Sequence, residues 1–352
     1  MRRRHFLGIA AAAATAGPVL AQPSGAEHPL WPLWTAWRDA HLDFSGRVVD
    51  APQRGASHSE GQSYGMSIAV EVGDEDAFRR MAAWTQENLA IRGDALLAWR
   101  WLPDVPERVP DLNNASDGDL FHAWALLRGA ERFGHAAWRD SAAAVASDLV
   151  RSCVASRPDR PGQPILLPAA EGFTTPDGVI VNPSYMMPLA MREVAAATGQ
   201  PELDRAATSG LSLMSEIAQE AVVPDWLELT PEGRRAPSGF SHDAGYEALR
   251  VPLFLAWSGE HGHPALARAA DAMARAPQGL SATVLDAGTG AVLETSGDPG
   301  YRAVAALSHC AAEGGPGAPI PPYSPAQPYY PSTLHMFVMM AQIRTLPACL
   351  PI

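Results

Sequence analysis

The sequence predicts an all-α fold in which helices are joined by irregular loops. Apolar residues recur at three- and four-residue spacing along most of the chain, which is the period of an amphipathic helix. Proline and glycine clusters separate these runs, and strand-like runs are short, with 165–167 and 291–293 the best examples. A single helix pair cannot bury so many apolar faces, so we expect a ring of helix pairs whose loops build a cleft at one end.

Eleven helical runs can be placed in chain order. The first starts at Trp31 and continues through Trp34 to Leu42, and proline and glycine break the pattern at 157–162. The full set is 31–42, 62–72, 75–90, 119–133, 136–153, 183–198, 201–219, 244–258, 263–274, 299–312 and 328–345. The proline-rich run 314–328 is expected as a surface loop. No linker divides residues 22–352, which we take as a single domain.

Residues 1–21 have the pattern of an export signal. Arg2 to Arg4 are followed by the apolar run 6–16, and residues 19–21 resemble a signal-peptidase site. Residues 3–7 also resemble a twin-arginine signal. A membrane anchor is the alternative, but a bilayer crossing takes ~20 apolar residues. We therefore expect a periplasmic or secreted protein without a membrane span after signal removal.

The charge balance excludes some partners. The chain has 26 basic and 38 acidic residues, a formal net charge of −12, and no lysine. Such an acidic protein is a poor candidate for binding nucleic acid or anionic lipid, and is compatible with a neutral substrate. Cys153, Cys310 and Cys349 are far apart, so we expect neither a zinc site nor a disulfide framework. One disulfide of unreadable pairing and three buried thiols both remain open.

Three loop-to-helix junctions carry carboxylates in polar, glycine-containing surroundings. They are 57–66 with Glu60, 113–119 with Asp117 and Asp119, and 240–250 with Asp243 and Glu247. Glycoside hydrolysis needs one protonated carboxylic acid and one ionised carboxylate, ~6.5–9.5 Å apart in inverting enzymes. Glu60 fits the acid if Tyr64 and other aromatic residues shield it from water, although a helix N-terminus favours the ionised form.

Each carboxylate also has a plainer interpretation. Glu60 is compatible with an ordinary first-turn helix residue, and residues 116–119 form a good N-capping sequence. Asp243 and Glu247 are four residues apart, so on a helix they would share a face where Arg250 could form a surface ion pair.

Aromatic residues in loop contexts are candidates for stacking on the apolar faces of sugar rings. Trp99, Tyr185 and Trp226 lie beside polar residues or proline, where a core position is less obvious. Core packing is the alternative for each of them.

Five motifs in fixed order carry a family resemblance. They are Ser59-Glu60-Gly61-Gln62-Ser63-Tyr64-Gly65-Met66, Asn114-Ala115-Ser116-Asp117-Gly118-Asp119, Asn182-Pro183-Ser184-Tyr185, Pro224-Asp225-Trp226 and Tyr246-Glu247-Ala248-Leu249-Arg250-Val251-Pro252-Leu253. Together they resemble glycoside hydrolase family 8, in particular the members that accompany bacterial cellulose synthase, over about residues 30–345. The resemblance implies an (α/α)6 barrel of about twelve helices and inverting hydrolysis of β-1,4-glucan without a metal or cofactor.

The resemblance also implies residue roles. Glu60 falls on the general acid, and Asp117 on a carboxylate that binds and distorts the sugar at the cleavage point. The substrate-binding candidates are Tyr64, Trp99, Asp119, Tyr185, Trp226 and Arg250, the last as a supporting arginine.

The catalytic base is where this chain departs from the family pattern. The family usually reads Tyr-Asp-Ala-Ile-Arg-Val, whereas this chain has glutamate at position 247, preceded by an apparent insertion at 242–245. Glu247 is the favoured base because Tyr246 and Arg250 stay in register. Asp243 is the alternative, and a displaced base with weak activity is a third.

The leading hypothesis is an exported endoglucanase that acts on cellulose, with a β-glucan chain as its partner and a functional association with cellulose synthase. Hydrolysis of another β-glycan, such as chitosan, xylan or mixed-linkage glucan, is the first alternative. A non-catalytic glucan-binding protein is the second, and the altered base motif is its support.

Overall fold

The computed structural model describes residues 27–352, so the signal-peptide prediction for residues 1–21 lies outside the described residues. Eleven α-helices follow one another in this part of the chain. They are α1 (Trp31–His41), α2 (Ser59–Val72), α3 (Glu75–Asn88), α4 (Ser116–Phe133), α5 (Ala136–Cys153), α6 (Pro188–Thr198), α7 (Pro201–Ala218), α8 (Arg250–Trp257), α9 (Pro264–Met273), α10 (Pro299–Glu313) and α11 (Tyr329–Thr345).

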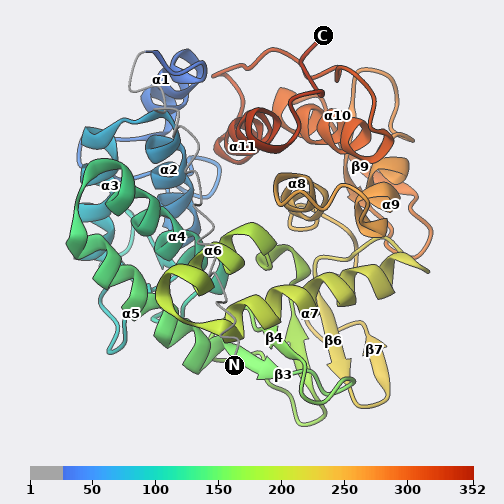
Figure 1. The fold of residues 1–352 in the computed structure, drawn as a ribbon, viewed down its shortest axis with the longest axis horizontal. Coiled ribbons are helices and arrows are strands. Elements are labelled where there is room, and N and C mark those ends of the chain that lie inside the picture. The colour runs from blue at the N-terminus through green and yellow to red at the C-terminus, as the bar shows by residue number, and fades with distance from the viewer. Residues whose placement is uncertain (1–26) are drawn as a thin grey trace, which may run out of the picture.

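The helices form two layers around a common axis (Figure 1). Helices α2, α4, α6, α8 and α11 make a closed inner ring, in which each contacts the next and α11 contacts α2. The remaining helices lie outside this ring. Most residues of α2, α4 and α11 are buried, whereas α3 and α5 bury one face. This is the predicted (α/α)6 arrangement, with eleven helices among the described residues rather than about twelve.

Short antiparallel strands lie in the connections between the helices. Strands β1 (Ser57–His58) and β2 (Arg100–Trp101) pair, as do β3 (Val154–Ser156) with β4 (Pro164–Leu166) and β8 (Ser281–Leu285) with β9 (Val292–Ser296). Strands β5 (Val179–Val181), β6 (Leu227–Thr230) and β7 (Gly233–Arg235) form a three-stranded sheet in that order. Strands β4 and β9 overlap the two best strand-like runs of the sequence.

Two predicted helices begin later than expected. The run 183–198 starts as a 3-10 turn, Pro183–Tyr185, and α6 begins only at Pro188. The backbone before Pro188 is extended, because a residue that precedes proline is disfavoured in the helical region. The run 244–258 becomes helical only at Arg250, after a turn at 246–249.

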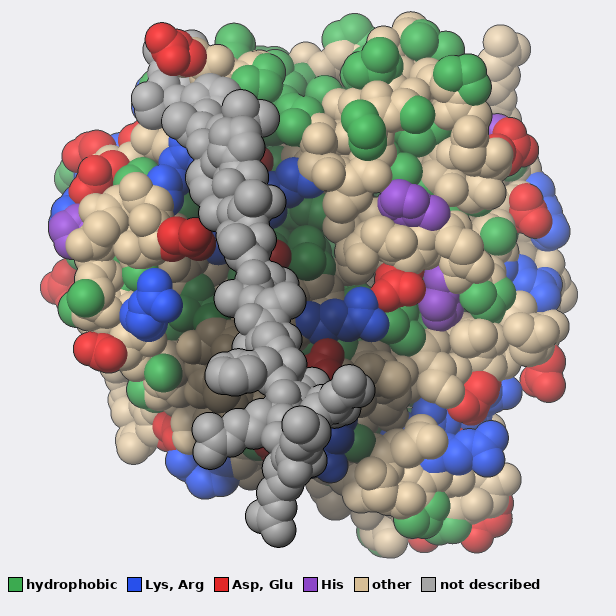
Figure 2. All heavy atoms as spheres, in the orientation of Figure 1, with side chains coloured by type: hydrophobic (Ala, Val, Ile, Leu, Met, Phe, Trp, Pro, Cys, Tyr) green, Lys and Arg blue, Asp and Glu red, His purple; other side chains and the backbone are tan. Residues whose placement is uncertain are grey.

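The cysteine pairing that the sequence leaves open is defined in the structure. Cys310 and Cys349 form a disulfide, and Cys153 is a buried free thiol. None of the helices within residues 27–352 has the length and apolar character of a membrane span. On the visible part of the face in Figure 2, arginine and acidic side chains are interspersed and neither sign forms a continuous patch.

Candidate active site

Glu60 and Asp117 come from the N-termini of two neighbouring inner helices, where each is the second residue of its helix. Gly118 allows the two N-termini to approach closely. A Cβ at this position would lie 2.3 Å from Ser59 Oγ and 2.8 Å from the backbone nitrogen of Glu60. Ser63 Oγ also donates to the Gly118 carbonyl at 3.0 Å. Helix packing thus brings together two carboxylates that are 57 positions apart in the sequence.

Glu247 comes from the opposite side of the site, in the turn that leads into α8. The backbone N–H of Arg250 donates to the Glu247 carbonyl at 3.1 Å. Its carboxylate accepts from Arg250 Nη2 and from Asn182 Nδ2, the latter at 3.4 Å. Arg250 Nη2 also donates to Ser184 Oγ at 2.9 Å.

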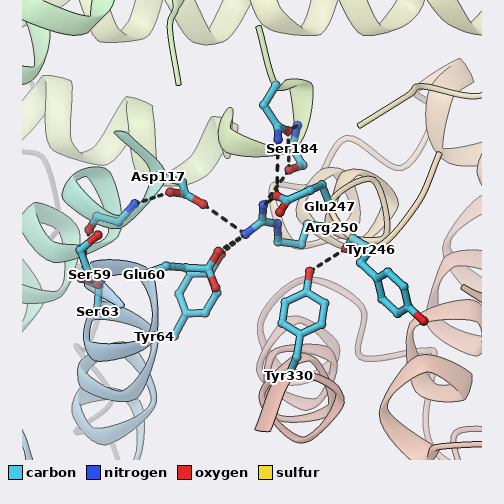
Figure 3. Close-up of polar contacts among 12 residues, drawn as sticks. Ser59, Glu60, Ser63, Tyr64, Asp117, Ser184, Tyr246, Glu247, Arg250 and Tyr330 are labelled. Atoms are coloured by element: carbon cyan, nitrogen blue, oxygen red, sulfur yellow. Dashed lines mark hydrogen bonds and ion pairs between the residues drawn. The ribbon is translucent and has the colours of Figure 1, made fainter. Parts of the chain in front are cut away.

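Arg250 joins the three carboxylates (Figure 3). Its side chain is only 1 % exposed. Nη1 donates to Glu60, to Asp117 Oδ2 at 3.1 Å and to the Tyr64 hydroxyl at 3.0 Å. Glu60 and Glu247 reach the guanidinium from different sides (Figure 3). The arginine therefore fixes the relative positions of the acidic groups.

The charges in this cluster favour a bound proton. Burial raises the pKa of Asp117 well above its usual range, and the Glu60 carboxylate raises it further while Arg250 lowers it. Burial also raises the pKa of Glu247, although Arg250 opposes the shift. One guanidinium thus faces three carboxyl groups, and the repulsion among them adds to burial in favouring the neutral form of Asp117.

A cavity of about 560 Å³ opens over the cluster. Glu60, Asp117 and Glu247 all reach its wall. The aromatic part of the wall consists of Trp99, Tyr185, Tyr246, Tyr301, Tyr329 and Tyr330. Aromatic faces with a few polar groups match a sugar ring, which has apolar faces and a polar edge.

Three polar atoms in the cavity wall have no hydrogen-bond partner among the described residues. They are His58 Nε2, Ser59 Oγ and the Tyr329 hydroxyl, all buried. Burial lowers the pKa of His58, although the Glu60 carboxylate opposes the shift. The sequence analysis did not assign His58 and Ser59 to the site, whereas Tyr329 follows a proline-rich run and is one of the aromatic residues in a loop context that the sequence offers for sugar stacking. The proximity of His58 and Ser59 to Glu60 in the chain was the available signal.

The structure separates the two candidate bases. Asp243 does not line the cavity, and its carboxylate accepts from Ser241 Oγ at 3.3 Å. Because residues 246–249 form a turn, the plainer interpretation, in which Asp243 and Glu247 share a helix face, is wrong. Of the two, the structure brings Glu247 to the cavity.

Tyr64 and Asp119 do not reach the cavity, contrary to their prediction as substrate contacts. Asp119 Oδ1 accepts from the Leu97 N–H and Oδ2 from Asn114 Nδ2, both at 2.8 Å. Tyr64 is fully buried and its hydroxyl accepts from Arg250. The polar atoms of both side chains contact other protein groups, so these two residues hold the site together without facing the cavity. Arg250 does the same.

Trp226 lies just beyond the cavity wall. Its ring meets Tyr185 edge to face, with centroids 6.1 Å apart. Trp99 and Tyr185 line the cavity itself. Contact of these three rings with a glucan stays a prediction. Among residues 27–352 no group of three or more His, Cys, Asp or Glu side chains is arranged to hold a metal ion.

Comparison with known proteins identifies the family. The model of glycosyl hydrolases family 8 matches residues 11–344. The chain belongs to glycoside hydrolase family 8. The resemblance based on the five motifs is thereby confirmed.

The relatives are endoglucanases. A probable endoglucanase of Novacetimonas hansenii is 33% identical, covering 88% of this chain and 90% of the relative. An endoglucanase of Xanthomonas axonopodis pv. citri (strain 306) is 31% identical, covering 96% and 92%. The solved endo-β-1,4-glucanase CMCax of Acetobacter xylinum superposes with a TM-score of 0.80 at 32% identity, covering 89% of this chain and 98% of that one. This last match confirms the predicted barrel fold for this member of family 8.

Proposed function

We propose that this family 8 enzyme cleaves internal β-1,4 bonds of glucan chains with inversion, using Glu60 as general acid and Glu247 as general base. The observation that carries the roles is the placement of both carboxylates in one aromatic-lined cavity, on different sides of Arg250. The endoglucanase relatives support the reaction and the substrate.

In the proposed reaction, Glu60 donates its proton to the glycosidic oxygen as the bond to C1 breaks. A water molecule attacks C1 from the opposite face and gives its proton to the Glu247 carboxylate. One chain leaves with a new hydroxyl group, and the other carries a reducing end of inverted, α configuration. Glu247 then releases its proton to solvent and Glu60 takes one up from solvent, which restores both groups.

Asp117 has a different role in this proposal. Its Oδ1 accepts from the Gly118 N–H at 2.7 Å and its Oδ2 faces Arg250, so it is held rigidly at the cavity wall. We assign it to binding and distorting the sugar at the cleavage point, where hydrogen bonds that strengthen in the transition state lower the barrier.

A fluoride substrate separates the acid from the base. Fluoride leaves without protonation, so hydrolysis of β-cellotriosyl fluoride needs the base but little help from the acid. We expect Glu60→Gln to lose about 10²–10⁴-fold on cello-oligosaccharides and far less on the fluoride. Glu247→Gln should lose activity on both substrates. NMR of the first product should show the α anomer.

Asp243→Asn is the matched control, and it should keep wild-type rates on both substrates. Full activity of Glu247→Gln together with an inactive Asp243→Asn would transfer the base role to Asp243. A folded wild type that binds glucan but releases no reducing ends would favour the binding-protein alternative. Rates on chitosan, xylan and mixed-linkage glucan test the substrate class.

The place of action is a separate part of the proposal. We propose that residues 1–21 direct export and that the enzyme acts on nascent cellulose beside a cellulose synthase. The export-signal pattern and the family resemblance support this proposal. Fractionation of cells, with and without residues 2–21, should move the protein between an exported and a cytoplasmic pool if the segment is a signal.

A further inference from the structure

Asp225 is a buried carboxylate that the proposed reaction does not use. It is 8% exposed and directly precedes Trp226 and β6. Its Oδ1 accepts from the backbone N–H groups of Gly245 at 2.9 Å and Ala248 at 2.7 Å. These two donors flank Glu247 in the chain.

The main chain of Asp225 binds the same segment. Its N–H donates to the Asp243 carbonyl at 2.8 Å. Ala244, the next residue, exchanges two backbone hydrogen bonds with Leu285 of β8, at 2.9 and 2.8 Å. The segment 243–248 is therefore fastened at both ends, and Asp225 supplies three of the contacts.

The sheet that begins just after Asp225 also helps to hold the carboxylate of Glu247. Leu227 of β6 pairs with Val181 of β5, and β5 leads directly to Asn182, whose Nδ2 donates to Glu247 at 3.4 Å. Asp225 and Asn182 are therefore connected through the paired strands β6 and β5, and both contact the segment that carries Glu247. Contacts from this part of the structure thus fix both the backbone around Glu247 and its carboxylate.

Gly245 fits this arrangement closely. A Cβ at this position would lie 2.6 Å from Asp225 Oδ2, a distance that real Cβ atoms do not tolerate without movement of the carboxylate. Glycine therefore lets the Asp225 side chain reach the N–H groups of the turn.

We propose that Asp225 is a positioning residue for the general base, which holds the turn 245–248 so that Glu247 faces the cavity. The inference rests on the proposed role of Glu247. A glutamate has one more rotatable bond than an aspartate, so its carboxylate is placed accurately only if the backbone and the tip are both fixed. An error of about 1 Å in a reacting group can cost about 10²-fold in rate.

Asp74 provides a matched control for a purely structural role. It is also 8% exposed. It caps α3 by accepting from the Ala77 N–H at 3.0 Å, and it accepts from Trp34 Nε1 at 2.9 Å. Arg38 Nη1 also donates to it at 3.1 Å. Asp74→Ala thus removes three hydrogen bonds to a buried carboxylate, one more than Asp225→Ala removes, without touching the cavity wall.

The test compares Asp225→Ala, Asp225→Asn and Asp74→Ala. We expect Asp225→Ala to lower kcat about 10- to 100-fold on cellopentaose and on β-cellotriosyl fluoride alike, with KM changed less than about threefold. Asp225→Asn keeps an oxygen that can accept both N–H groups, so it should restore most of the rate. Asp74→Ala should lower Tm but leave kcat unchanged.

Three outcomes would overturn the inference. One is an Asp225→Ala enzyme with normal kcat and reduced Tm, like Asp74→Ala. A second is a loss on cellopentaose without a loss on the fluoride, which would place the defect at the acid. The third is an Asp225→Asn enzyme as inactive as Asp225→Ala, which would show that the charge rather than the hydrogen bonds matters.

Gly245→Ala is the second variant if Asp225→Ala fails to fold. It displaces the carboxylate without removing it, and it should reduce kcat on both substrates; unchanged rates would contradict the inference. Failure of the proposed function is separable, because a fully active Glu247→Gln would remove the base role itself, whatever the Asp225 variants do.

Discussion

At the scale of single residues, the direction of a side chain decides its role. Asp117 and Asp119 belong to one capping-like segment, yet Asp117 reaches the cavity and Asp119 is buried behind it. Residues two apart on a helix point about 200° apart, so they cannot both face the same ligand. The motif predicts a functional carboxylate here, but the helix orientation that brings Asp117 rather than Asp119 to the cavity depends on packing against α2.

The length of the base side chain is a second residue-scale question. We expect Glu247→Asp to be less active, because its carboxylate retracts by one C–C bond, about 1.5 Å, while Asp225 and Asn182 hold the backbone and the original tip position. A loss of about tenfold or more in kcat, with little change in KM, is the expected result. Kinetics on cellopentaose measure it. An equally active Glu247→Asp would mean that the turn adjusts to either length.

At the scale of elements, periodicity predicts helices well and their first turns poorly. The run 244–258 has a helical pattern, but α8 begins at Arg250. Residues 245 and 248 donate their N–H groups to Asp225, about twenty positions earlier in the chain. No local pattern contains that contact. The same holds for Glu60, Asp117 and Glu247, whose convergence on Arg250 follows from the closure of the inner helix ring.

The loop 236–243 supports an aromatic element beside the cavity. Phe240 packs on Trp226 with centroids 4.6 Å apart, and Phe173 stacks on Trp226 at 5.7 Å. His242 Nδ1 contacts the Trp226 carbonyl at 3.1 Å. Trp226 in turn contacts Tyr185 in the cavity wall. The loop therefore holds the indole beside Tyr185, just beyond the cavity wall.

We expect Phe240→Ala to weaken binding of long substrates selectively. An aromatic contact contributes about 0.5–1.5 kcal/mol beyond burial, so KM for cellohexaose should rise about three- to tenfold while kcat on β-cellotriosyl fluoride stays constant. Phe44→Ala is the control, since Phe44 is 93% exposed. Equal KM values for both variants would show that Trp226 does not depend on Phe240, or does not bind glucan.

At the scale of the whole molecule, the ring must be closed by its last helix. Helix α11 packs against α1, α2, α8 and α10 and carries Tyr329 and Tyr330 to the cavity wall. The chain that follows α11 returns to the segment after α10, where Gly317 and Ala318 donate to the carbonyls of Ala348 and Leu350, both at 2.7 Å. The disulfide fastens the same region. Sequence alone could not predict this pairing, because cysteine spacing carries no information on how the chain ends meet.

We expect the disulfide to stabilise the barrel without taking part in catalysis. Cys310 and Cys349 are 39 positions apart, and closing a loop of this length in the unfolded chain is worth about 4 kcal/mol in the chain-entropy model. The double variant Cys310→Ser, Cys349→Ser should therefore lower the free energy of unfolding in urea by a few kcal/mol, while kcat on cellopentaose at 25 °C stays unchanged. Cys153→Ala is the control. Its stability should still fall when reductant is added, whereas the double variant should not respond. A large loss of kcat in the folded double variant would instead show that the link also sets the position of α11 and of the tyrosines it presents to the substrate.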